Sequence, residues 1–215
     1  MKKSSSLELT KEELLLATTN QGKIKEIKGY LEDLPIGIVG LQELSPKPIF
    51  AEKGKTFLEN ARGKSLFYSK RYHLLTLAED SGLEIEYLKG APGVFSSRFS
   101  GPQATDEKNI EKVLKLMKGI PPDQRKAQFV SCLVLTDKGK RIKEIRESVK
   151  GLITVEKRGN YGFGYDSIFF FPPLKKTFAE LLPEEKNRVS HRGRALKKLK
   201  AFLVLYLESE KKIYV

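Results

Sequence analysis

The chain alternates apolar runs with amphipathic stretches, and this pattern predicts most of its secondary structure. Residues 14–18 (LLLAT) form an apolar run of strand length, and a polar loop then leads to apolar side chains at helical spacing from about residue 23 to residue 34. Further strands are predicted at residues 36–41, 74–78, 83–87, 127–136, 141–155 and 168–171. Further helices are predicted after the N-cap residues Thr56 and Thr105 and over residues 190–207.

The order of these elements indicates the fold class. Strands and helices alternate at the start of the chain, whereas strands follow one another later, so we predict an α/β fold with a mixed central sheet flanked by helices. The chain has 215 residues, 40% of them hydrophobic, which is enough for one sizeable core. We expect a single domain over residues 14–215, preceded by a short extension over residues 1–13.

The stretch 77–101 carries the strongest chemical signal, and its centre is the run Glu79, Asp80, Ser81 and Gly82. The apolar run 74–78 predicts a buried strand, and we expect the two carboxylates at its end, followed by a Ser-Gly turn into a second strand. Ligands of open α/β sheets bind near strand ends, so this is a candidate site. The alternative is a pair of solvated acids at a hairpin turn.

Composition narrows the classes of function. The single cysteine, Cys132, lies in an apolar run and is predicted to be buried, and two histidines cannot form a histidine metal cluster. A bound metal would therefore be a hard cation on carboxylate oxygens, Mg²⁺ or Mn²⁺. The net charge of +13 favours a polyanionic partner, yet the lysines are interleaved with glutamates and no nucleic-acid-binding motif is present. We expect no stable binding to nucleic acid.

The termini and hydropathy indicate the compartment. No apolar run approaches the roughly 20 residues that span a bilayer. The basic first residues are not followed by the apolar segment of a signal peptide. We therefore expect a cytoplasmic protein with no membrane partner.

Two loops have residues suited to phosphate and base. Free amides at a helix start attract phosphate, and hydroxyl, amide and lysine side chains add to this in the loop Thr18, Thr19, Asn20, Gln21, Gly22 and Lys23. It matches neither nucleotide-binding glycine signature, so an ordinary capped helix start is the alternative. In the loop Phe163, Gly164, Tyr165 and Asp166, an aromatic ring could stack on a base and the carboxylate could accept a hydrogen bond, unless the loop is simply an aromatic turn on the core.

Two further sets of charged residues complete the candidates. Glu52, Glu79 and Asp80 offer the one or two carboxylates that a magnesium-nucleotide site needs, and one acid could take a proton from water. Lys186, His191 and Arg192 are predicted at the start of the last helix, where the helix dipole disfavours cations, so an anionic or acceptor-rich ligand would offset them. A surface basic cluster is the alternative.

Several segments together resemble the inosine triphosphate pyrophosphatase family, which hydrolyses non-standard purine nucleoside triphosphates. In chain order they are ATTNQGKIKEI, FAEKGKTFLENA, LAEDSGLEIEYLKGAPGVFSSRFSG, ATDEKN, GFGYDSIFF and TFAELLPEEKNRVSHRGRAL. The resemblance implies a two-lobed fold with the site in a cleft, a homodimer, and hydrolysis of ITP, dITP and XTP to the monophosphate and pyrophosphate.

The resemblance also implies roles for individual residues. Residues 18–23 would hold the triphosphate, Glu52 and Asp80 the magnesium, and Asp80 would also accept the proton. Ser81 would lie beside the substrate, and residues 163–166 with Lys186, His191 and Arg192 would surround the nucleotide. The chemistry of the bases, rather than the resemblance, indicates that a site donating from Arg192 or a backbone amide to the 6-oxo group would reject adenine, whose 6-amino group leaves those donors unpaired.

The chain departs from the family pattern at three positions. It has Thr19, Glu79 and Ser167 where family members often have Gly, Asp and Pro. None of these changes removes a group that the chemistry needs. Two rival functions fit the same pattern: a pyrophosphatase for modified pyrimidine or methylated nucleotides, and a basic nucleic-acid-binding protein on the same fold.

Overall fold

The computed structural model describes residues 13–45 and 48–213. Its centre is a mixed seven-stranded sheet in the order β2-β1-β3-β4-β5-β6-β7, with β2, β1 and β3 parallel and the later pairs antiparallel. The strands are β1 (Glu13–Leu16), β2 (Gly37–Gly40), β3 (Leu75–Ile85), β4 (Lys126–Asp137), β5 (Lys140–Ile153), β6 (Phe169–Phe171) and β7 (Lys176–Thr177). The predicted mixed α/β fold is confirmed. The predicted extension over residues 1–13 lies outside the described residues except for Glu13, which begins β1, so the extension itself stays a prediction.

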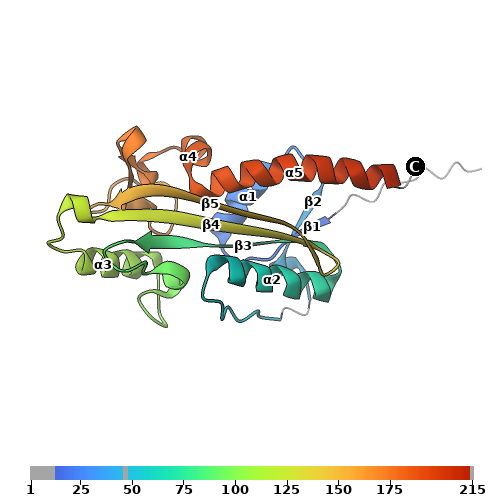
Figure 1. Cartoon of the computed structure of the whole chain (residues 1–215), viewed down its shortest axis with the longest axis horizontal. Coiled ribbons are helices and arrows are strands. Elements are labelled where there is room, and N and C mark those ends of the chain that lie inside the picture. The colour runs from blue at the N-terminus through green and yellow to red at the C-terminus, as the bar shows by residue number, and fades with distance from the viewer. Residues whose placement is uncertain (1–12, 46–47, 214–215) are drawn as a thin grey trace, which may run out of the picture.

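Helices cover both faces of this sheet (Figure 1). They are α1 (Gln21–Leu31), α2 (Phe57–Tyr72), α3 (Asp106–Leu116), α4 (Pro183–Val189) and α5 (His191–Ile213). One core joins α1 and α5 to the strands through residues such as Ile27 and Leu199, and α2 packs against the other face through Ala61 and Tyr68. The start of α5 therefore lies on the opposite side of the sheet from α2. A division into two lobes stays a prediction.

The helix starts follow the predicted caps. The side chain of Thr56 accepts from the Glu59 amide at 3.1 Å, and that of Thr105 accepts from the Lys108 amide at 3.2 Å. The last helix begins at His191 rather than Ser190, because residue 190 ends the separate helix α4. Lys186 therefore belongs to α4, and its predicted place in the first turn of the last helix is wrong.

The central stretch differs from the prediction. Residues 81 and 82 do not form a turn, because β4 pairs with β3 at every position from Thr76 to Ile85. Gly82 is needed inside this strand, since a side chain there would collide with Ser96 Oγ from the neighbouring 3₁₀ segment. Glu79 and Asp80 thus lie in mid-strand rather than at a strand end, and the alternative of solvated turn acids is wrong as well.

The short first strand leaves part of β3 unpaired on one side. β1 pairs with β3 only from Leu14↔Leu75 to Leu16↔Leu77, and the chain then leaves the sheet toward α1. Beyond that point β3 continues to Ile85 with β4 on its other side. We call residues 79–82 the free edge of β3. It lies at the carboxyl end of β1, where open α/β sheets place their ligands.

Two smaller predictions are also settled by the described residues. Cys132 is buried in β4 between the sheet and α2, and burial raises the pKa of its thiol to about 11, so it is a core residue as predicted. None of the helices in the described part of the chain combines the length and the apolar character needed to cross a membrane.

Candidate functional site

A cavity of about 600 Å³ lies against the free edge of β3. Its lining comes from the loop before α1, the segment before α2, α2 itself, β3, β4, the loop after β5, α4 and the starts of α3 and α5. It gathers nearly all of the predicted site residues, namely Thr18, Thr19, Asn20, Lys23, Glu52, Asp80, Ser81, Phe163, Gly164, Tyr165, Asp166, Lys186, His191 and Arg192. Gln21 and Gly22 are the predicted residues that do not line it. Gln21 is exposed, and Gly22 packs beneath the ring of Phe163.

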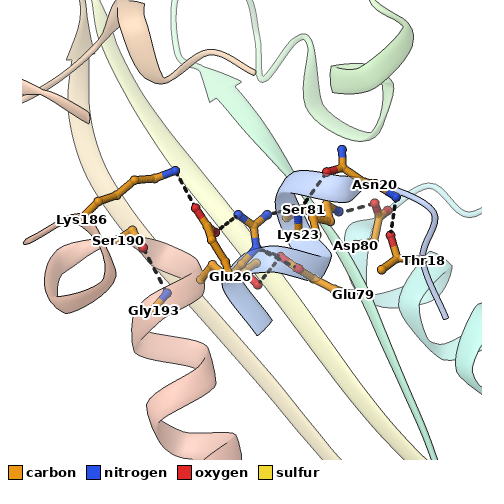
Figure 2. Close-up of polar contacts among 12 residues, drawn as sticks. Thr18, Asn20, Lys23, Glu26, Glu79, Asp80, Ser81, Lys186, Ser190 and Gly193 are labelled. Atoms are coloured by element: carbon orange, nitrogen blue, oxygen red, sulfur yellow. Dashed lines mark hydrogen bonds and ion pairs between the residues drawn. The ribbon is translucent and has the colours of Figure 1, made fainter. Parts of the chain in front are cut away.

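The loop before α1 is held rigid by its own side chains (Figure 2). Asn20 caps α1 by accepting from the Lys23 amide at 3.0 Å, and Thr18 Oγ1 accepts from the Asn20 amide at 3.2 Å. Burial lowers the pKa of Lys23, although the negative charge of Glu79 opposes this. A helix N-terminus with a lysine inside the cavity is suited to bind phosphate.

Asp80 projects to the α2 side of the sheet. Its carboxylate accepts from Asn60 Nδ2 at 3.0 Å and from the Ser81 amide at 3.0 Å, and 8% of the residue is exposed. Burial raises the pKa of Asp80, and the negative charge of Glu52 adds to this. A buried carboxylate with a raised pKa is a stronger proton acceptor than a free aspartate.

Glu52 is the other carboxylate that could share a metal with Asp80. It forms ion pairs with Lys64 and, at 3.7 Å, with Arg98. Burial would raise the pKa of Glu52, but these cations and Lys23 outweigh it and lower the pKa. Among the described residues no group of three or more His, Cys, Asp or Glu side chains could hold a metal. Two hard oxygen donors in one cavity still fit Mg²⁺, which takes its remaining ligands from water and phosphate.

Glu79 does not join this pair, because it projects to the α5 side of the sheet. Both of its carboxylate oxygens accept from Arg192 Nε at 2.9 Å, and one also accepts from Ser131 Oγ at 3.0 Å. Burial would raise the pKa of Glu79, but the charges of Arg192 and Lys23 hold it well below its ordinary value. The predicted cluster of Glu52, Glu79 and Asp80 is therefore split between two faces of the sheet.

Arg192 is fixed by acceptors of the protein itself. Besides binding Glu79, its Nη1 donates to Glu26 at 2.6 Å and its Nη2 donates to Ser81 Oγ at 3.0 Å. Glu26 also accepts from Lys186 Nζ at 2.8 Å (Figure 2). Lys186 donates in turn to Asp166 at 2.5 Å. Carboxylates of the protein thus neutralise the cations near the start of α5. These cations are buried, so the alternative of a basic cluster on the surface is wrong.

The loop 163–166 forms one end of the cavity. The ring of Phe163 is half-buried, 4.9 Å from Lys186 Nζ and 5.2 Å from Arg192 Cζ, measured to the ring centroid. Tyr165 is buried and its hydroxyl donates to the Ser96 carbonyl at 2.8 Å, so its ring belongs to the core. Of the two aromatic residues, only Phe163 is placed to stack on a ligand.

His191 contributes the most unusual polar atom of the cavity. Its ring stacks on Phe129 with 4.6 Å between centroids, and its Nδ1 is buried with no hydrogen-bond partner among the described residues. Burial lowers the pKa of this histidine well below 6.5, so the ring is neutral at pH 7. A buried nitrogen without a partner is costly unless a ligand or water satisfies it.

Comparison with known proteins shows the family of the chain. The model of the Ham1 family matches residues 14–202. The chain belongs to the Ham1 family. It is 46% identical to a dITP/XTP pyrophosphatase of Clostridium perfringens, over 86% of this chain and 94% of that protein. It is 44% identical to a dITP/XTP pyrophosphatase of Bacillus subtilis, over 89% of this chain and 96% of that one.

Solved structures of the Ham1 family share the fold. The Ham1 protein of Coxiella burnetii matches with a TM-score of 0.82 and 41% identity, covering 90% of this chain and 98% of that one. The Staphylococcus aureus Ham1 protein matches with a TM-score of 0.80 and 40% identity, covering 89% and 98%. The family resemblance inferred from the sequence is therefore confirmed.

This Ham1 family site also contains residues that the sequence analysis missed. Asn60 anchors Asp80, Lys64 pairs with Glu52, Asp106 lines the cavity, and Glu26 joins Lys186 to Arg192. One signal was available: Glu26 follows Lys23 by three residues, which puts both on one side of α1. Asn60 also stands beside Ala61 on the buried face of α2, where a polar residue needs a partner.

Proposed function

We propose that this chain hydrolyses the non-standard purine nucleoside triphosphates ITP, dITP and XTP to the monophosphate and pyrophosphate, and so clears them from the nucleotide pool. The observation that carries the proposal is one cavity in which a phosphate-binding helix start lies with a buried carboxylate of raised pKa. The names of the relatives, dITP/XTP pyrophosphatase, support the same substrates. We further propose a cytoplasmic homodimer.

The triphosphate is assigned to the loop before α1. Amides of residues 18–23 and the side chains of Thr18, Asn20 and Lys23 supply donors and a positive charge at the helix start. Asp80 and Glu52 would hold Mg²⁺, which when bound neutralises phosphate oxygens and polarises water. These roles leave the α-phosphorus near the free edge of β3, within the space that Asp80 lines.

Asp80 is assigned the role of proton acceptor. Water attacks the α-phosphorus, a proton passes from that water to the Asp80 carboxylate, and the bond from the α-phosphorus to the oxygen that bridges it to the β-phosphate breaks. Pyrophosphate leaves with that bridging oxygen. Asn60 orients Asp80 for this step by donating to one of its oxygens.

The base is assigned to the end of the cavity formed by Phe163, Lys186, His191 and Arg192. Phe163 offers an aromatic ring, and the neutral ring of His191 lines the same end of the cavity. Each nitrogen of Arg192 donates to a protein acceptor, Nε to Glu79, Nη1 to Glu26 and Nη2 to Ser81, and Nη1 and Nη2 each carry a second N–H. Buried polar groups of this kind favour 6-oxo purines over adenine, because adenine would leave some of these protein groups without a hydrogen-bond partner.

The proposal is tested by pyrophosphate release from ITP, dITP, XTP, GTP, ATP and dTTP, each with and without Mg²⁺. We expect magnesium-dependent release from the first three and little from the standard nucleotides. Preferential turnover of modified pyrimidine or methylated nucleotides would replace the substrate class. Salt-dependent binding to DNA or RNA without turnover of any nucleotide would overturn the assignment as a hydrolase.

A further inference from the structure

Asp106 connects α3 to the loop that carries Phe163. It is the first residue of α3, and its carboxylate accepts from the Gly164 amide at 2.7 Å. Both residues line the cavity, although they come from segments far apart in the chain. Asp106 is exposed, so its position at the cavity is not explained by packing into the core.

The position of Phe163 depends on this loop. The Phe163 amide donates to Asp166 at 3.0 Å, and the Tyr165 hydroxyl donates to the Ser96 carbonyl at 2.8 Å. Gly164, between them, has a positive φ of 59°, so the chain changes direction directly after Phe163. The bond to Asp106 fixes the peptide at this point.

The ring of Phe163 has little room to move. A Cβ on Gly22 of α1 would come within 2.6 Å of the ring, and Lys186 Nζ and Arg192 Cζ lie 4.9 and 5.2 Å from the ring centroid. A shift of the Gly164 peptide would therefore move the ring away from Gly22, Lys186 and Arg192. It would change the face that the ring presents to a ligand.

We propose that Asp106 is a positioning residue: by holding the Gly164 amide it fixes the Phe163 ring at the nucleobase end of the cavity. The proposal rests on the proposed function, since it concerns the binding of the same nucleotide. Charge-assisted hydrogen bonds of this kind are stronger than neutral ones, and precise placement of binding groups sets substrate affinity.

The experiment compares Asp106→Ala, Asp106→Asn and Glu107→Ala. Asparagine keeps an oxygen that can accept from Gly164, whereas alanine does not. Glu107→Ala is the matched control, because it removes the other acid from the first turn of the same helix and does not line the cavity. The readouts are kcat and KM for dITP, and the hydrogen-exchange rate of the Gly164 amide measured by NMR without nucleotide.

For Asp106→Ala we expect a KM about tenfold higher, a kcat within about twofold of the unsubstituted protein, and exchange of the Gly164 amide at least about tenfold faster, as the loss of a charged hydrogen bond predicts. Asp106→Asn should recover most of both effects, and Glu107→Ala should show neither. An unchanged KM in Asp106→Ala, or equal impairment of the asparagine variant, would overturn the positioning role. Absence of turnover in the unsubstituted protein would overturn the proposed function, and the positioning role with it.

Discussion

Glu79 and Asp80 are neighbours in β3, yet their carboxylates bind to opposite layers of the protein. Glu79 accepts from Arg192 of α5 at 2.9 Å, and Asp80 accepts from Asn60 of α2 at 3.0 Å. This follows from the alternation of side chains along a strand. The two acids therefore have separate tasks: Asp80 is available for chemistry, and Glu79 fixes a buried arginine.

Replacement of Asp80 by asparagine should lower kcat by at least about 10²-fold, because the proton acceptor is lost while the shape is kept. The measurement is steady-state release of pyrophosphate from dITP. Glu84→Gln is the matched control, since Glu84 lies on the same strand outside the cavity. Near-normal turnover in Asp80→Asn would remove Asp80 from this role.

Replacement of Glu52 by glutamine should raise the Mg²⁺ concentration that gives half-maximal activity by about tenfold, since one of two protein ligands loses its charge. A titration of Mg²⁺ at saturating dITP measures this. Glu59→Gln serves as the control, because Glu59 accepts from the Lys55 amide and lies outside the cavity. Equal metal dependence in both variants would exclude Glu52 as a ligand.

Glu79 should make the stability of the protein depend on pH. Its folded-state pKa lies well below its ordinary value of 4.5, so its stabilisation is complete above that value and is lost as the pH falls through the folded pKa. Glu79→Gln should therefore lower the free energy of unfolding by about 3–5 kcal/mol at pH 7, since Arg192 is left buried without its main partner. The difference should shrink below about pH 4.

Urea unfolding of both proteins at several pH values measures this difference. The double variant Glu79→Gln with Arg192→Met removes both charges and should be less destabilised than the sum of its single variants. A difference that stayed constant between pH 3 and pH 7 would contradict the assignment of the effect to the Glu79 charge.

Replacement of His191 by phenylalanine should separate binding from stability. The new ring can keep the stacking on Phe129, and the variant loses a buried nitrogen that has no partner in the described protein. We expect the free energy of unfolding to change by less than about 1 kcal/mol and KM for dITP to rise about tenfold. Thermal unfolding and steady-state kinetics measure the two quantities. An unchanged KM would mean that the ring nitrogens of His191 do not contact the nucleotide.

The sequence predicted which residues line the cavity better than how they are arranged in it. Apolar spacing and caps located the helices after Thr56 and Thr105, because both signals are local. The predicted turn at Ser81 and Gly82 was wrong because these residues pair with β4, which lies about fifty positions later in the chain. This distant pairing overrides the local preference for a turn. Glu26 was missed for a similar reason: its partners Lys186 and Arg192 are distant in the sequence, and only the packing of α1 on α5 brings them to it.

The length of β1 has a consequence for how this fold can vary. If the chain paired with β3 for five residues more before turning into α1, the backbone of β1 would fill the space beside residues 79–82, and the sheet would be continuous there. Such a protein would keep its core and its helices but would lack the cavity. The capacity for chemistry in this architecture is thus controlled by the stopping point of one strand, so insertions between Leu16 and Asn20 should be far less tolerated than insertions in the hairpin turn between β4 and β5.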